Sequence, residues 1–129
     1  MGGAMATLLA ADLYLHDKNV YNSSLVRVFT YGSPKVFAKN TATDWSTKLR
    51  VYRWAYDDSK GMGDHVPQMP SSSFEHVGKT YKIYRKFRFL KSSQYSFRSQ
   101  SDQWNPSPRY KVGRHKASVY TEALNKGCK

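Results

Sequence analysis

Residues 25–36 read LVRVFTYGSPKV and decide the fold class of this chain. The first seven are aliphatic, β-branched or aromatic apart from Arg27, a composition typical of a largely buried strand. Gly32, Ser33 and Pro34 then form a turn signal that ends the strand. We therefore expect a strand over residues 25–31 whose carboxyl end passes at once into a tight loop.

Helices and further strands flank this strand. Apolar residues recur at helical spacing over residues 3–15, with alanines between them, which predicts a buried amphipathic helix that can lie close to a sheet. Strands are expected over residues 49–56 and 79–90, the latter alternating apolar and basic residues. Residues 91–114 predict a long loop and residues 117–125 a short final helix. This order of elements predicts an α/β fold.

Composition limits the classes of protein to consider. A length of 129 residues suits one domain, and 40% hydrophobic residues exclude a disordered chain. Every apolar run is far shorter than the roughly 20 residues that cross a membrane, so we expect a soluble or peripheral protein. The single cysteine, Cys128, allows no disulfide within the chain, and its partner is left open.

Positive charge is concentrated in one third of the chain. The formal net charge is +12, and residues 79–116 hold eleven Lys or Arg against one Asp, a local +10. Aromatic residues lie between these cations, a pattern that suits single-stranded nucleic acid. Strand alternation explains the same pattern, with the aromatic residues on a buried face and the cations on a solvated face. If the cations do bind an acidic partner, an anionic lipid surface is favoured over nucleic acid. A non-enzymatic basic module that binds an anionic lipid surface or nucleic acid is therefore the alternative hypothesis.

Four segments, in this order, resemble the class 3 (fungal-type) lipase family of the α/β-hydrolase fold. They correspond to the family's Gly-His-Ser-Leu-Gly-Gly-Ala, Thr-Tyr-Gly-x-Pro-Arg-Val, Asp-x-Val-Pro-x-Leu-Pro and Phe-x-His-x-Gly patterns. In this chain they are MGGA at residues 1–4, TYGSPKV at 30–36, DHVPQMP at 64–70 and FEHVG at 74–78. The resemblance covers residues 1 to about 84 and leaves 85–129 as a divergent basic loop and C-terminal helix.

The family implies a fold and a reaction. We expect residues 1–129 to form a single partial domain, a three-layer αβα sandwich with about three core strands, mostly parallel, and without the N-terminal half of the sheet. The implied activity is hydrolysis of carboxylic esters, in particular acylglycerols, by a serine nucleophile, and the substrate is a lipid or another ester. No metal and no organic cofactor is implied.

The position of the first motif bears on the nucleophile. If Gly2 is the last glycine of Gly-x-Ser-x-Gly, the serine lies one residue before Met1, and the backbone N–H at Met1 is an oxyanion-hole donor. Gly2 and Gly3 are then the small residues that let this turn approach neighbouring strands. We therefore expect the chain to be a fragment that is inactive by itself.

The rest of the triad lies inside the chain. The Asp-x-Val-Pro context implies that Asp64 is the acid, with Asp57 and Asp58 as nearby alternatives. His115, the last histidine, is the candidate base; Tyr120 follows it by five positions, where the family commonly has His-x-x-Tyr. His76 matches the family's Phe-x-His-x-Gly histidine and is expected to be structural, although it stays an alternative base.

Other properties are left open by the sequence. The acyl chain and the ester class remain undecided among lipase, phospholipase and feruloyl-type esterase, and so does the oligomeric state. Localisation is also open, although Asn22-Ser23-Ser24 is an N-glycosylation sequon that agrees with the secretion of many family members.

Overall fold

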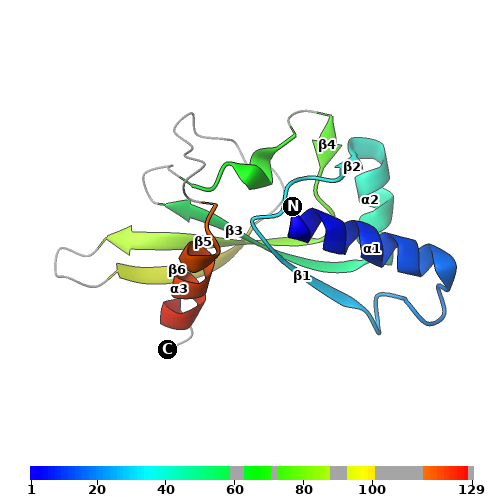
Figure 1. Ribbon diagram of the computed structural model, residues 1–129, viewed down its shortest axis with the longest axis horizontal. Coiled ribbons are helices and arrows are strands. Elements are labelled where there is room, and N and C mark those ends of the chain that lie inside the picture. Colours follow the sequence, from blue (N-terminus) through cyan, green and yellow to red (C-terminus); the bar gives the residue numbers. More distant parts are fainter. Residues whose placement is uncertain (59–62, 71–72, 88–92, 101–114, 128–129) are drawn as a thin grey trace.

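The computed structural model describes residues 1–58, 63–70, 73–87, 93–100 and 115–127 (Figure 1). Within these residues, helices and strands alternate in the order expected of an α/β protein. In chain order the elements are α1 (Gly2–His16), β1 (Arg27–Tyr31), β2 (Phe37–Ala38), α2 (Lys39–Lys48), β3 (Arg50–Asp58), the 3-10 helix η1 (Val66–Gln68), β4 (Phe74–Glu75), β5 (Lys79–Phe87), β6 (Ser93–Gln100) and α3 (Ala117–Gly127).

The main sheet has four strands in the order β1-β3-β5-β6. β1 pairs with β3 and β3 with β5 in parallel, so that Val28 lies level with Val51 and Trp54 with Tyr81. Parallel neighbours place their carboxyl ends at the same edge of the sheet, which is where loops carry binding residues in α/β proteins. These three strands are the three that the sequence predicts, and they agree with the expected mostly parallel sheet.

Strand β6 corrects the prediction of a long loop over residues 91–114. Residues Ser93–Gln100 pair with β5 in antiparallel register, from Thr80 opposite Gln100 to Phe87 opposite Ser93. The polar sequence SQYSFRSQ gives a weak strand signal by itself, but pairing satisfies the backbone groups of both strands. The rest of that segment, residues 91–92 and 101–114, lies outside the described residues, as do 88–90 of the strand expected over 79–90.

Helices pack against both faces of the sheet. Val51 belongs to a core cluster with Ala10 and Ala11 of α1, whereas Tyr56 belongs to a second cluster with Tyr120 of α3. Because side chains alternate along a strand, residues 51 and 56 of β3 point to opposite faces. Figure 1 shows α1 and α2 on one side of the strands and α3 on the other, so the arrangement has three layers.

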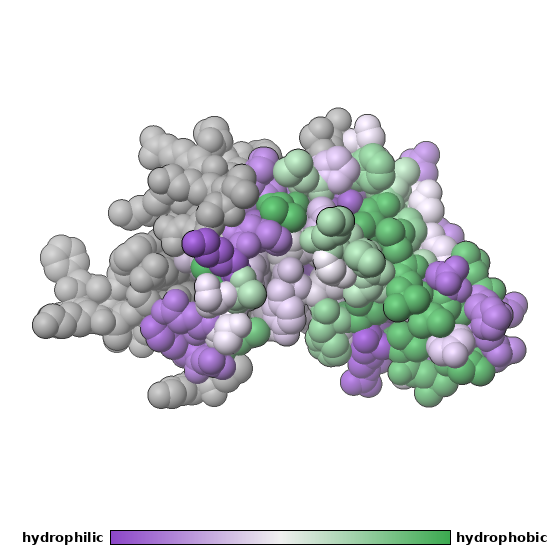
Figure 2. Space-filling model, in the orientation of Figure 1, coloured by the Kyte–Doolittle hydropathy of each residue, from purple (hydrophilic) through white to green (hydrophobic). Residues whose placement is uncertain are grey.

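The orientation of α1 differs from the expected amphipathic burial. Its buried residues are Thr7, Ala10 and Ala11, and these small side chains let it lie close to β1, as predicted. Its large apolar side chains point away, with Leu9 57% and Leu15 73% exposed. Figure 2 shows the resulting hydrophobic surface over α1. The helix is apolar on nearly every side, so periodicity could not decide which face meets the sheet.

Helix α2 and the short β2–β4 pair were not predicted. Residues Lys39–Lys48 read as a polar segment, yet Ala42 and Trp45 are buried against the core on the α1 side. β2 and β4 pair antiparallel, which holds the segment after β1 beside the segment before β5. None of the described helices has the length and hydropathy needed to cross a membrane.

Candidate active site

Asp64 lies just beyond the carboxyl end of β3 and is completely buried, with 0% of its surface exposed. Its backbone N–H donates to the Tyr56 carbonyl at 2.9 Å, which holds the loop after β3 against that strand. A neighbouring loop begins at Gly32, whose N–H donates to the Trp54 carbonyl at 2.9 Å. The ends of β1 and β3 therefore hold Gly32 and Asp64 at the same edge of the sheet.

Three donors surround the Asp64 carboxylate. Nδ1 of His115 lies 2.7 Å from Oδ2, and the Tyr120 hydroxyl donates to the same Oδ2 at 2.5 Å. The backbone N–H of Val66 donates to Oδ1 at 2.9 Å. Buried carboxylates are stabilised only when their oxygens are hydrogen-bonded, and here both oxygens have partners. The carboxylate is thus fixed in place with one oxygen facing His115.

The contact with Asp64 sets the tautomer of His115. A carboxylate oxygen can only accept, so Nδ1 carries the proton and Nε2 of the neutral ring has a free lone pair. The His115 side chain is 31% exposed, so the ring reaches the surface while Nδ1 is held inside. An orienting carboxylate and a general base require a contact of this kind between a carboxylate oxygen and Nδ1.

Gly32 is a site residue that the sequence analysis placed in a turn signal and in the TYGSPKV segment without giving it a role in the site. It has φ +61°, and a Cβ there would lie 2.7 Å from Asp64 Oδ2 and 2.8 Å from His115 Nδ1. Only glycine takes this conformation without strain and leaves the space free. Its position at the end of a strand, in front of Ser-Pro and within the TYGSPKV segment, was the sequence signal that could have found it.

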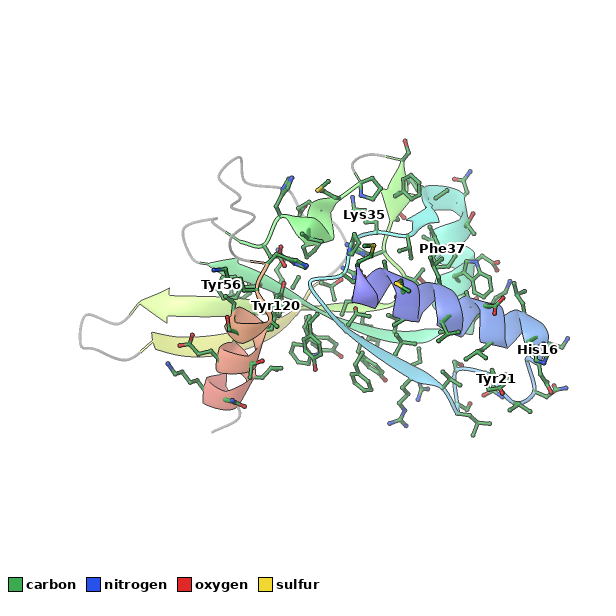
Figure 3. All side chains as sticks on the ribbon, viewed as in Figure 1. His16, Tyr21, Lys35, Phe37, Tyr56 and Tyr120 are labelled. Atoms are coloured by element: carbon green, nitrogen blue, oxygen red, sulfur yellow. The ribbon has the colours of Figure 1, made fainter. Side chains whose placement is uncertain are left out.

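Tyr120 is the second residue whose role the sequence did not give. It lies in the first turn of α3 and is buried against Tyr56, whose backbone N–H donates to its hydroxyl at 3.3 Å. Figure 3 shows Tyr56 and Tyr120 together where α3 meets β3. Burial, and then the charge of Asp64, raise the pKa of Tyr120 above its ordinary value of 10.0, so the phenol stays a donor. Tyr120 therefore ties α3 to the acid.

His76 lies in a different environment, after β4. Its Nε2 donates to the Pro67 carbonyl at 2.6 Å. Burial, followed by the positive charge of Arg53, lowers the pKa of His76 to about 3, so the ring is neutral at ordinary pH. A nitrogen that donates to a carbonyl cannot accept a proton from a nucleophile. This geometry favours the structural interpretation of His76 over its use as the base.

The start of α1 reaches the same end of β1 from the other side. A Cβ on Gly3 would lie 2.8 Å from Ser33 Cβ and 3.2 Å from Thr30 Cβ, so Gly3 makes the close approach expected of this turn. Gly2 has open space around it, which does not fit the expectation that it too must be small. Met1 is the N-cap of α1 and is 86% exposed.

The alternative acids lie at the end of β3. Asp57 and Asp58 are strand residues level with Tyr84 and Arg85 of β5, and their side chains lie outside what the structure describes. Among the described residues, the carboxylate beside His115 is that of Asp64. Much of the basic segment 79–116 also falls outside the described residues. Within the described part, no group of three or more His, Cys, Asp or Glu is placed to hold a metal ion.

A pocket of about 340 Å³ opens beside His115, between the end of β1 and α3. Such a volume falls within the range of about 300–1,000 Å³ that is usual for small-molecule sites. Most of its wall is apolar, so it suits an organic group next to the imidazole. The lining residues are Tyr31, His115, Lys116, Ala117, Tyr120, Thr121 and Leu124.

Comparison with known proteins assigns the family. Residues 1–74 match the family described as Lipase (class 3), a stretch that includes Gly3, Gly32 and Asp64 but ends before His115 and Tyr120. Neither a search of curated proteins nor a search of solved structures found a match. The match covers more than half of the chain and agrees with the mostly parallel sheet flanked by helices. The chain belongs to the class 3 lipase family.

Proposed function

We propose that Asp64 and His115 are the acid and the base of a serine hydrolase that cleaves lipid esters. The family supports lipid ester hydrolysis in general. The observation that carries the residue assignment is the 2.7 Å contact between His115 Nδ1 and the buried Asp64 Oδ2. No observation comparable to the family match favours the alternative of a non-enzymatic basic module.

The chemistry follows from the orientation of the imidazole. Nε2 of His115 accepts the hydroxyl proton of the serine as its oxygen attacks the ester carbonyl. The imidazolium that forms lies beside the Asp64 carboxylate, which stabilises the positive charge and keeps the ring from turning. Nε2 then gives the proton to the departing alcohol, leaving an acyl-enzyme that water hydrolyses by the same route.

Tyr120 and Gly32 serve this pair as positioning residues. The Tyr120 hydroxyl holds Asp64 Oδ2 from the side of α3, and Gly32 leaves the space in which Oδ2 and Nδ1 meet. Preorganised partners matter because a misplacement of about 1 Å at a reacting group can reduce the rate about 10²-fold.

The proposal includes the nucleophile and the oxyanion hole. From the offset of the first motif we propose that the serine lies directly before Met1 and that the backbone N–H at Met1 is one donor to the developing oxyanion. Gly3 supports this placement, because its contact with Thr30 and Ser33 is the close packing that a nucleophile elbow requires. The 129-residue chain by itself then has no esterase activity, and acylglycerols are the proposed substrates of the protein that carries the serine.

The test compares two proteins made from the same gene. One is the 129-residue chain, and the other retains the coding sequence upstream of Met1. Hydrolysis of p-nitrophenyl butyrate and tributyrin is expected only from the second. Asp64→Asn and His115→Ala should each reduce its kcat by about 10³-fold or more, whereas the matched change His16→Ala, at an exposed histidine, should have no effect.

Two outcomes would overturn the proposal. If the longer protein keeps its activity after His115→Ala, His115 is not the base. The assignment of the nucleophile fails if the residue before Met1 is not a serine. It also fails if the longer protein keeps its activity when that serine is replaced by alanine.

A further inference from the structure

A second pocket, of about 530 Å³, lies at the opposite end of the sheet from Asp64. Arg50 and Lys79, the first residues of β3 and β5, both line it. In a parallel sheet these first residues share one edge, and the proposed acid and base lie beyond the other. The full lining is Ser23, Ser46, Thr47, Leu49, Arg50, Val51, Tyr52, Gly78 and Lys79, none of which is acidic.

Three cations, Arg27, Arg50 and Lys79, lie near one another at this edge of the sheet, and no ion pair among the described residues involves them. Arg27 of β1 lies level with Arg50, and Lys79 lies level with Tyr52, two residues further along β3. Like charges on adjacent strands repel each other and destabilise a sheet. Within the described part of the chain, the ion pairs of Lys and Arg involve Lys39, Lys48 and Lys126, not these three cations. An anion bound in the pocket between Arg50 and Lys79 would reduce this repulsion.

The hydrogen-bond donors of the pocket can be identified one by one. Ser46 donates its hydroxyl proton to the Ala42 carbonyl and accepts from Gly78 N–H, and Thr47 donates to the Asp44 carbonyl. These two hydroxyls are therefore already engaged. The side-chain donors left for a ligand are the guanidinium of Arg50, the ammonium of Lys79 and the hydroxyls of Ser23 and Tyr52, all of which suit the oxygens of an anion.

The pocket also has an apolar wall. Leu49 and Val51 are buried on the side of α1 and α2. Tyr52 points to the opposite face, the face of Arg50, where its ring is stacked between Phe29 and Tyr81 with centroids 5.1 and 6.3 Å away. Stacking from both sides fixes the Tyr52 ring and leaves its edge for a ligand. The volume exceeds that of a bare phosphate or carboxylate, so the pocket has room for an organic group beside the anion.

We propose that this pocket binds a phosphate ester, with the phosphate between Arg50 and Lys79 and its small organic group against Tyr52. Guanidinium binds phosphate through two parallel hydrogen bonds, and lysine adds a point charge. The last turn of α2 also lines the pocket, and the helix dipole places about half a negative charge there. The two full positive charges of Arg50 and Lys79 outweigh it. The phosphate can belong to a lipid headgroup or to a soluble phosphomonoester, since both present the same chemistry.

Binding is tested on the 129-residue chain, independently of ester hydrolysis. Glycerol 3-phosphate is titrated by calorimetry, and phosphatidylcholine vesicles with and without phosphatidic acid are tested by co-sedimentation. The double variant Arg50→Gln/Lys79→Gln should weaken binding of the phosphate ester about tenfold or more, since it loses charge-assisted hydrogen bonds. Arg50→Lys/Lys79→Arg should retain part of the affinity.

The matched control is Lys39→Gln/Lys126→Gln, which removes the same charge from exposed positions outside the pocket. Circular dichroism and thermal unfolding show whether each variant is folded. Binding of glycerol 3-phosphate that is lost in the pocket variant identifies a soluble ester, and binding of phosphatidic acid vesicles alone identifies a headgroup. No binding of either probe by the folded wild-type chain, or equal weakening by the pocket variant and the control, would overturn the proposal. Neither result bears on Asp64 or His115.

Discussion

Tyr120 and Asp64 are joined by a 2.5 Å hydrogen bond that links the first turn of α3 to the loop after β3. The oxygen that receives it, Oδ2, also receives the His115 Nδ1 proton. Helix docking and the orientation of the base therefore depend on one carboxylate oxygen.

Tyr120→Phe removes this hydroxyl and leaves the ring in place. We expect a loss of about 1–3 kcal/mol in the free energy of unfolding, because a buried charged acceptor loses a donor. Urea unfolding of both proteins measures it. Tyr31→Phe is the matched control, since Tyr31 is 44% exposed and packs against the ring of Tyr120; it should change stability by less than about 0.5 kcal/mol. Equal losses in both variants would contradict the role of the hydroxyl.

Gly32→Ala should separate Asp64 from His115. The new Cβ meets both side chains at under 3 Å, and a left-handed φ of +61° adds backbone strain of about 1–2 kcal/mol. Proton NMR should show loss of the slowly exchanging Nδ1–H signal of His115, together with lower stability. Gly2→Ala is the control, because a Cβ there meets nothing within 4 Å and helix α1 gains about 0.5–1 kcal/mol. If Gly32→Ala retains the signal, the proposed crowding is wrong.

His76 should make the protein sensitive to acid. Burial lowers the pKa of His76 from 6.5 to about 3 in the folded chain. Between these two pH values the imidazole is therefore protonated in the unfolded chain and neutral in the folded chain. Stability therefore falls as the pH drops from about 6.5 toward 3, by up to about 1.4 kcal/mol per pH unit. Urea unfolding between about pH 4 and pH 7 measures the slope. His76→Gln keeps an N–H donor for Pro67 and should flatten the slope, whereas His16→Gln, at an exposed site, should not.

Substitutions in α1 distinguish its two sides. Ala11→Leu puts a larger side chain against the sheet and should destabilise the fold by about 1–3 kcal/mol through overpacking. Leu15→Gln changes a side chain that is 73% exposed and should alter stability by less than about 0.5 kcal/mol. Thermal unfolding of the two variants gives the comparison, and the opposite order would mean that the large apolar face meets the sheet.

The sequence predicted those features that depend on local composition. β1, β3 and β5 were located because they are rich in β-branched and aromatic residues, with a turn signal after β1 and alternating apolar and basic residues along β5. Asp64 was located by its Asp-x-Val-Pro context. β6 was missed because its own residues are mostly polar and it forms a strand only by pairing with β5. Gly32 and Tyr120 were missed for the same reason, since their partners are distant in the chain and only folding brings them to Asp64 Oδ2.

The docking of α3 on the sheet through Tyr120 and Ala123 has a consequence for heat inactivation. Among the side chains of α3 that the structure describes, those of Tyr120 and Ala123 are buried, against Tyr56 and Ile83, and the same helix follows closely after His115. Segments with few buried contacts open locally at lower free energy than the whole fold. When α3 detaches, the imidazole leaves its carboxylate while β1, β3 and β5 stay paired. On warming, the contact between His115 and Asp64 should therefore be lost before the sheet unfolds. Hydrogen exchange should show faster exchange of the backbone amides of α3 than of those of β1, β3 and β5.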